Sequence, residues 1–219
     1  MEREIITTAD GSSTIFIPQW NESYHSKHGA IQEAYHVFIK NGFSLFEGKP
    51  VSILEIGFGT GLNAFITLIE ANKLNTSVHY TGVEAFPVLE KELSHLNYSN
   101  QFEKQYQHYF TEIHQTDWEK ENLITSNFIL TKNQMYFQDI SFENQFDLIY
   151  FDAFGFRVQP ELWSVEIFKK MYDALKTNGV LVTYACRTSI KNAMLEVGFS
   201  IEKLPGAPGK REMLRATKR

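Results

Sequence analysis

The chain has 219 residues, of which 43% are hydrophobic, so it is long enough for one well-buried domain and short for two. Its single cysteine, Cys186, excludes an internal disulfide and a multi-cysteine zinc site, and we expect no bound metal. The net charge of −5 argues against non-specific nucleic-acid binding over the whole surface, but a local basic face stays possible. A charged N-terminus with no long apolar run predicts a cytoplasmic protein without a membrane span.

Residues 1–45 are predicted to form an extension that packs on the main domain. β-forming segments at 4–8 and 13–17 flank an Asp-Gly pair, which is a strong hairpin signal. Apolar positions at helical spacing predict a helix over 30–40. The Tyr-His-Ser stretch at 24–26 lies where the extension could fold over a neighbouring ligand, although a structural or surface role for its histidine is the simpler interpretation.

A glycine-rich turn organises the main domain, predicted over residues 46–219. An apolar strand pattern at 51–56 stops at Gly57, Gly59 and Gly61, and a helical apolar pattern begins directly after them. Glycines allow a sharp turn and a close approach to a ligand, and the helix start offers free N–H groups. This pattern predicts a site for a small polar ligand.

The spacing of the glycines indicates which ligand is favoured. A dinucleotide fingerprint has its third glycine three residues after the second, whereas here Gly61 follows Gly59 by two. Glu55, two residues before Gly57, is also foreign to that fingerprint. The pattern Glu-x-Gly-x-Gly-x-Gly resembles the nucleoside-binding loop of S-adenosylmethionine-dependent methyltransferases. The alternative is that the glycines only make a strand-to-helix turn.

Three acidic residues follow predicted strands and should meet at one edge of the sheet, because carboxyl ends of parallel strands share that edge. Glu84 suits two ribose hydroxyls as an acceptor, although an incidental strand-end charge is the alternative. Asp139 stands where an acid commonly accepts from the adenine amino group in this fold. Asp152 follows the strand beside the glycine strand and is the leading catalytic candidate.

The predicted elements define an α/β, Rossmann-like class I methyltransferase fold. Its mostly parallel, seven-stranded sheet should have the last strand antiparallel, with the N-terminal hairpin and helix added to it. The predicted strands are 51–56, 79–84, 128–130 paired with 135–137, 146–151, 180–184, 201–204 and 212–216. The predicted helices are 62–69, 89–96, 100–114, 164–175 with a C-cap at 177–179, and 188–197.

Several motifs together resemble the MnmC-type tRNA (5-methylaminomethyl-2-thiouridine) methyltransferase module over about residues 24–216. They are Gly57-Phe-Gly-Thr-Gly-Leu-Asn63, Glu84-Ala-Phe-Pro87, Asp139-Ile140, Phe151-Asp-Ala-Phe154, Pro160-Glu-Leu-Trp163 and Gly209-Lys-Arg-Glu-Met-Leu214. The resemblance implies S-adenosyl-L-methionine as cofactor, tRNA as substrate and methylation of the aminomethyl nitrogen of a modified wobble uridine. Phe156 departs from the family, which usually has proline there, so we expect the loop that follows Asp152, which we call the substrate loop, to take a different path.

Many relatives carry a second, flavin-dependent domain, which is not seen in this chain. We therefore expect a stand-alone methyltransferase that depends on a separate enzyme to supply the aminomethyl uridine. The alternatives are a transferase that methylates or aminopropylates a small amine, and a module that binds S-adenosylmethionine without reaction.

The resemblance assigns roles to individual residues. Asp152 is expected to accept the amine proton or to align the amine. The substrate or tRNA candidates are Phe154, Arg157, Lys210 and Arg211, although the last two also suit a solvated basic tail or the edge of the last strand. The cofactor candidates are Glu55, Gly57, Gly59, Gly61, Asn63, Glu84 and Asp139.

Overall fold

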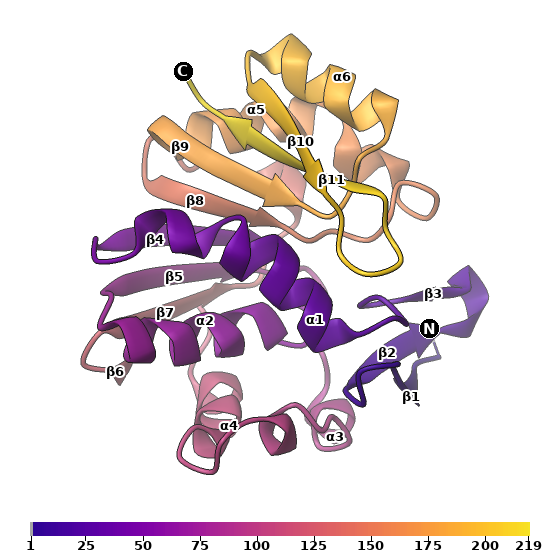
Figure 1. Cartoon of the computed structure of the whole chain (residues 1–219), viewed down its shortest axis with the longest axis vertical. Coiled ribbons are helices and arrows are strands. Elements are labelled where there is room, and N and C mark those ends of the chain that lie inside the picture. Colours follow the sequence, from indigo (N-terminus) through magenta and orange to yellow (C-terminus); the bar gives the residue numbers. More distant parts are fainter. Residues whose placement is uncertain (1) are drawn as a thin grey trace.

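The computed structural model describes residues 2–219 of the chain. Its centre is an eight-stranded sheet with the order β10-β11-β9-β8-β4-β5-β7-β6 (Figure 1). The strands are β4 (Val51–Ile56), β5 (Val78–Val83), β6 (Glu121–Thr125), β7 (Phe128–Asn133), β8 (Phe146–Phe151), β9 (Leu175–Thr183), β10 (Ser200–Pro205) and β11 (Glu212–Thr217). Apolar residues dominate the central strands because both of their faces are covered.

The strand directions confirm the predicted class of fold. Strand β4 pairs in parallel with β5 and β8, and these continue in parallel to β7 and β9. The last strand, β11, inserts antiparallel between β9 and β10, as the closing hairpin predicted. A crevice therefore opens at the carboxyl ends of β4, β5 and β8, where the chain reverses its direction of winding.

One edge of the sheet differs from the prediction. Strand β7 pairs with β6, which precedes it, and the predicted partner at 135–137 runs into a 3₁₀ turn, η5 (Phe137–Asp139). The tight turn before β7 is fixed by Asn127, whose side-chain amide donates to the carbonyls of Ala71 and Thr76. The pairing predicted for 128–130 with 135–137 was therefore wrong, and the sheet gains an eighth strand.

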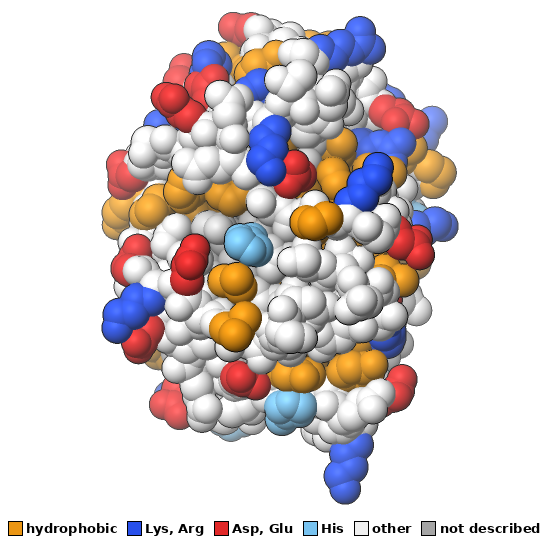
Figure 2. Space-filling model, turned by 90° about the vertical axis from the view of Figure 1, so that its left-hand side faces the viewer, with side chains coloured by type: hydrophobic (Ala, Val, Ile, Leu, Met, Phe, Trp, Pro, Cys, Tyr) orange, Lys and Arg blue, Asp and Glu red, His pale blue; other side chains and the backbone are white. Residues whose placement is uncertain are grey.

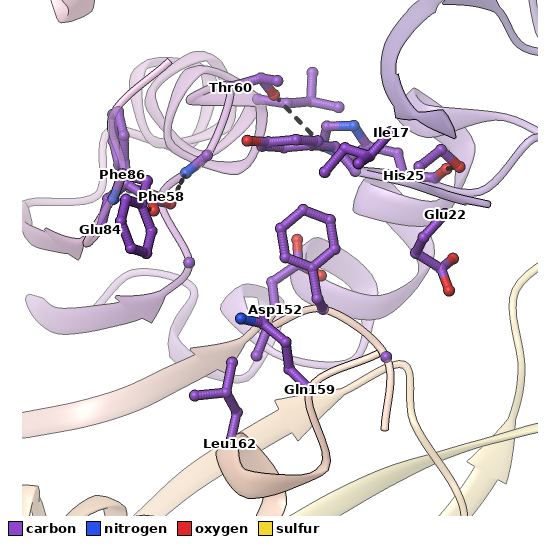
Figure 3. Close-up of a pocket in the computed structure, with 18 of the residues that line it drawn as sticks. Ile17, Glu22, His25, Phe58, Thr60, Glu84, Phe86, Asp152, Gln159 and Leu162 are labelled. Atoms are coloured by element: carbon purple, nitrogen blue, oxygen red, sulfur yellow. Dashed lines mark hydrogen bonds between the residues drawn. The ribbon is translucent and has the colours of Figure 1, made fainter. Parts of the chain in front are cut away.

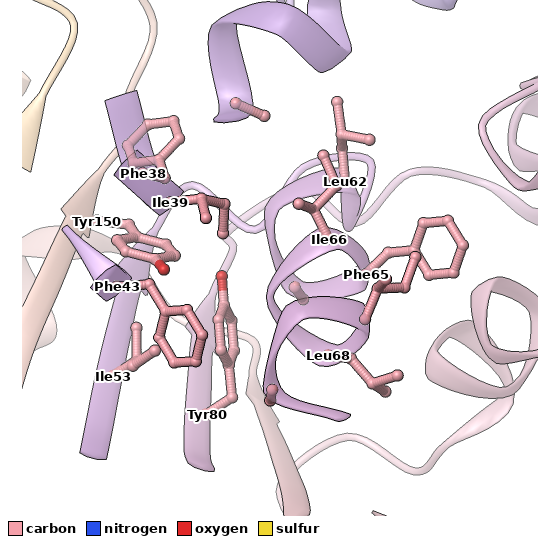
Figure 4. Packing of buried hydrophobic residues seen from close by; sticks show 14 of the residues in the cluster. Phe38, Ile39, Phe43, Ile53, Leu62, Phe65, Ile66, Leu68, Tyr80 and Tyr150 are labelled. Carbon is pink, nitrogen blue, oxygen red and sulfur yellow. The ribbon is translucent and has the colours of Figure 1, made fainter. Parts of the chain in front are cut away.

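Helices cover both faces of the sheet, as alternation along the strands requires. On β4, Ile53 packs with the helices α1 and α2, whereas Leu54 packs with α5 and α6 on the other face. On the first face, Phe38 packs against Tyr150 with ring centroids 5.0 Å apart (Figure 4).

The helical segments are α1 (Ala30–Ala34), the π-helical η2 (Tyr35–Lys40), the 3₁₀ turn η3 (Phe43–Phe46), α2 (Leu62–Leu74), α3 (Glu90–Leu93), the 3₁₀ turn η4 (Ser99–Gln101), α4 (Gln107–Gln115), the 3₁₀ turn η6 (Pro160–Trp163), α5 (Val165–Ala174) and α6 (Thr188–Val197). No helix within residues 2–219 is long and apolar enough to cross a membrane.

Two helix predictions were wrong in their extent. The segments 89–96 and 100–114 form only the short α3, a 3₁₀ turn and α4, because the chain between them is tied to the N-terminal hairpin. There, the Asn97 side chain accepts from the Ser13 amide at 2.7 Å and donates to the Gly11 carbonyl at 2.9 Å. Helix α5 ends at Ala174, so the predicted cap at 177–179 lies inside β9, where Asn178 has φ +64° beside a register shift.

The N-terminal extension forms a small antiparallel sheet of its own. It consists of β1 (Glu4–Thr7), β2 (Ser13–Ile17) and β3 (Glu22–Ser23), with the 3₁₀ turn η1 (Pro18–Trp20) between the last two. The predicted hairpin is thus confirmed, with β3 as an addition. Figure 1 shows this sheet beyond one end of the main sheet, on the same side as α1. On the opposite side of the molecule, acidic and basic side chains are interspersed (Figure 2).

Candidate active site

A cavity of about 1220 Å³ lies at the carboxyl ends of β4, β5 and β8. The small N-terminal sheet closes it on one side, while the glycine loop and the segments after β5 and β8 form the others. In Figure 3, Glu84 and Phe58 lie on one side of this pocket, and Asp152 lies near its centre. This volume is above the usual range for a drug-sized ligand, so it has room for a cofactor beside a second reactant.

The glycine loop has the backbone conformation that only glycine adopts without strain. Gly57, Gly59 and Gly61 have φ values of +88°, +50° and +70°. A Cβ on Gly57 would lie 2.7 Å from the carbonyl oxygen of Asp152, so this close approach also requires glycine. Helix α2 begins directly after Gly61. Gly57 and Gly59 line the pocket, while Gly61 packs beneath it against His114.

Glu84 is fixed beside the glycine loop by two backbone donors. Its carboxylate accepts from the Gly59 amide at 3.0 Å and from the Phe86 amide at 2.9 Å. A carboxylate has about four acceptor positions, so capacity is left for two ribose hydroxyls. The rings of Phe86 and Tyr136 meet edge to face at 5.8 Å and also line the pocket, where they offer an apolar surface to an adenine. The residues on this side therefore fit a nucleoside.

Asn63 connects a carboxyl group in the pocket wall with a second carboxyl group that lies below the pocket. Its side-chain amide donates to Glu55 at 2.9 Å and to Asp152 at 2.8 Å. Glu55 is only 1% exposed and also accepts from the Tyr80 hydroxyl, and it does not line the pocket. Burial raises the pKa of Glu55 well above its usual value. Glu55 therefore lies beneath the pocket, where it supports the glycine loop through Asn63, and its predicted contact with the cofactor stays a prediction.

Asp152 presents a half-buried carboxylate to the pocket from the end of β8. Burial raises its pKa to about 7, and the negative charge of Glu33 adds to this effect. The hydrogen bond from Asn63 and the positive charge of Lys210 act in the opposite direction. The carboxyl group can therefore exchange a proton near neutral pH, which is the property required of a general base.

Lys210 is held inside the pocket by partners that the sequence did not reveal. Its ammonium forms an ion pair with the buried Glu33 of α1 and lies 3.8 Å above the ring centroid of Tyr184. The Tyr184 hydroxyl donates to the Ala153 carbonyl at 2.8 Å. Lys210 thus lies in the pocket wall with its charge paired to Glu33, and its predicted contact with a tRNA phosphate stays a prediction. In the sequence, the only feature that could have indicated Glu33 as a site residue is its acidic side chain on the inner face of a predicted helix. No local pattern indicated Tyr184.

The N-terminal sheet closes the pocket with aromatic side chains. Trp20 and Tyr24 contact Phe154 edge to face, with centroids 5.4 and 4.9 Å away. This arrangement confirms that the stretch around Tyr24 folds over the glycine loop, and it brings Phe154 into the pocket as predicted. His25 is hydrogen-bonded to Thr14 through Nδ1 at 3.1 Å, and burial lowers its pKa to about 4. His25 also lines the pocket, and its contact with Thr14 holds it against the N-terminal sheet.

Three other predicted site residues lie apart from this pocket. Asp139 is exposed in η5 and does not line the cavity, although its neighbour Gln138 does. Arg157 donates to the carbonyls of Trp20 and Asn21 and pairs with a carboxylate of the N-terminal extension, so it connects the substrate loop to the extension. Arg211 is exposed and lines a second, smaller cavity beside the first.

The parallel sheet, the positive-φ glycine loop and the nucleoside-sized side of the pocket define a Rossmann-like methyltransferase of class I. Comparison with known proteins agrees with this class. The family described as S-adenosyl-L-methionine-dependent methyltransferase matches residues 96–219. The chain belongs to this family, and S-adenosyl-L-methionine is its cofactor.

Two similar curated proteins have the same name. The chain is 29% identical over 223 residues to "tRNA 5-methylaminomethyl-2-thiouridine biosynthesis bifunctional protein MnmC" of Polaromonas naphthalenivorans, covering 95% of this chain. It is 29% identical over 212 residues to the protein of the same name from Campylobacter fetus, covering 93% of this chain. In both cases the chain spans 34% of the length of the relative.

Solved structures agree on the fold. The crystal structure of MNMC2 from Aquifex aeolicus superimposes with a TM-score of 0.82 at 23% identity, covering 100% of this chain and 70% of the other. Spermidine synthase from Thermotoga maritima gives a TM-score of 0.55 at 14% identity, covering 95% of this chain and 69% of the other. At these identities the likeness concerns the fold alone, so it does not favour an aminopropyl transfer.

Proposed function

We propose that this methyltransferase acts on the aminomethyl nitrogen of a modified wobble uridine in tRNA. The observation that carries the proposal is the position of Asp152, between the cofactor side of the pocket and the aromatic N-terminal wall. The names of the MnmC relatives, which match over 95% and 93% of this chain, support the substrate. Methyl transfer creates no amine, so another reaction must first supply the aminomethyl group.

The cofactor side uses the glycine loop and Glu84. Gly57 and Gly59 allow the backbone to lie close to the methionine tail and the ribose, and Glu84 accepts from the ribose hydroxyls. The predicted contact of Asp139 with the adenine amino group requires its exposed side chain to turn toward the pocket. Bound S-adenosylmethionine supplies an electrophilic methyl group.

The acceptor side uses Asp152. A primary ammonium group cannot attack a methyl group, so it must lose a proton first. Asp152, with its pKa at about 7, is available to accept this proton, and the hydrogen bond from Asn63 fixes the orientation of its carboxylate. The rings of Tyr24 and Phe154 form an apolar wall against which a planar base can pack. Positioning of the amine contributes further, on the order of 7–11 kcal/mol for well-oriented reactants.

The direct test is methyl transfer from labelled S-adenosylmethionine to tRNA that carries the aminomethyl group, followed by nucleoside analysis. We expect label in methylaminomethyl uridine, or in its 2-thio form, and none with tRNA that is already methylated. Label in small polyamines but not in tRNA would contradict the proposal. Cofactor binding without transfer to any tRNA would contradict it as well and would indicate a non-catalytic module.

A further inference from the structure

A second cavity, of about 440 Å³, adjoins the active-site pocket. The two share Gly155, Tyr184 and Lys210 in their walls, so the second cavity continues the first along the substrate loop. Its remaining wall comes from the substrate loop, the segment between β9 and α6, the start of α6 and the start of β11 with the residue before it. We call this second cavity the side groove. Its volume is within the usual range for a small-molecule site.

The side groove is positively charged although the whole chain is acidic. Three arginines line it, and Arg157 is already paired with Glu22. Within residues 2–219, the guanidinium groups of Arg187 and Arg211 form neither a hydrogen bond nor an ion pair with protein. The one acid in the lining, Glu212, is paired with a lysine outside it, at 2.9 Å. The guanidinium groups of Arg187 and Arg211 therefore have no direct protein partner among the described residues.

The groove also offers a flat surface. The Arg187 guanidinium carbon lies 4.6 Å from the ring centroid of Phe156. This contact is a cation–π arrangement, and stacked guanidinium and aromatic planes are surfaces on which unpaired RNA bases pack.

We propose that the side groove binds the phosphate and ribose of a nucleotide adjacent to the target nucleotide in a single-stranded RNA loop, with Arg187 and Arg211 on the phosphate. This inference rests on the proposed function. A target base that enters the main pocket must first unstack from the neighbouring bases of the RNA. The adjacent nucleotide then lies beyond the wall that the two cavities share, in the side groove. The planar guanidinium group can donate two hydrogen bonds to the oxygens of one phosphate. Two guanidinium groups without a direct protein partner therefore favour the binding of a phosphate.

The first test combines Arg187→Ala and Arg211→Ala and measures binding of aminomethyl-bearing tRNA as a function of salt. Loss of this one phosphate contact should reduce the slope of log affinity against log salt by roughly 0.7 and weaken binding at least about tenfold. The matched control is Lys104→Ala, an exposed cation that lines neither cavity, which should change neither quantity. S-adenosylmethionine affinity should stay unchanged in all variants. An unchanged slope in the double variant would overturn the inference.

The second test locates the phosphate. Anticodon stem-loop RNAs are made with one neutral methylphosphonate on either side of the target nucleotide. One of these positions should weaken binding to the wild type about tenfold but leave binding to the double variant unchanged, because the charged partner is already lost. Equal weakening of both proteins at both positions would overturn the inference. The proposed function fails separately, if the wild type transfers no methyl group to tRNA while the salt and methylphosphonate experiments still report binding.

Discussion

Replacing Asp152 by asparagine should remove the methyl transfer while leaving the pocket intact. The two side chains have the same shape, and the Asn63 amide can still donate to the remaining oxygen at position 152. Asparagine cannot accept a proton, so we expect kcat/KM to fall about 10²–10⁴-fold, the usual contribution of a general base. Affinity for S-adenosylmethionine should change less than about twofold, because the glycine loop and Glu84 are untouched.

The same substitution should stabilise the protein at alkaline pH. Burial holds the pKa of Asp152 at about 7 in the folded state, against 3.8 for an exposed aspartate. The folded state therefore binds more protons between these pH values, and the free energy of unfolding falls as pH rises from about 4 to 7. The pKa difference between the two states sets an upper limit of about 4 kcal/mol for this loss of stability. Because the side chain is only half-buried, solvent screening leaves roughly 1–2 kcal/mol of this cost.

Thermal unfolding at pH 5 and pH 8 gives the measurement, together with methyl transfer over the same range. The midpoint of D152N should exceed that of the wild type at pH 8 by roughly 2–8 °C, with a smaller gain at pH 5. The matched control is Asp147→Asn on β8, the strand that Asp152 follows. The Asp147 carboxylate pairs with Lys176 at 2.9 Å, and this variant should keep activity and gain no stability. Turnover of D152N near that of the wild type, or an equal gain at both pH values, would refute the reasoning.

Two further substitutions test the parts of the pocket around Asp152. Asn63→Leu removes the donor at 2.8 Å, so the pKa of Asp152 should rise above about 7 and the acid limb of the kcat/KM profile should move up by about one pH unit. A profile that does not move would mean that this hydrogen bond does not tune the base. Glu84→Gln replaces one acceptor oxygen by a donor facing the Gly59 or Phe86 amide, so calorimetry should show about 10–100-fold weaker S-adenosylmethionine binding. Unchanged cofactor affinity would remove Glu84 from the ribose site.

The sequence by itself determined the sheet and the place of the pocket. Buried parallel strands show near-continuous apolar runs, and a strand, three glycines and a helix form one local unit that needs no distant contact. Since parallel strands end at the same edge, the positions of Glu84 and Asp152 beside the glycine loop followed from their places after strands. Strand β6 was not predicted because it is a short edge strand that begins with polar residues and leaves Leu123 exposed, so it has no buried apolar pattern.

Only the tertiary structure decided how the side chains around the reacting centre are connected. Glu33 and Lys210 are 177 residues apart in sequence and form an ion pair in the pocket, a contact for which neither local pattern has a signature. The structure also shows that Glu55 lies beneath the glycine loop, where its carboxylate accepts hydrogen bonds from Asn63 and Tyr80. Local periodicity fixes which face a residue occupies, whereas its partner across the pocket depends on how all elements pack.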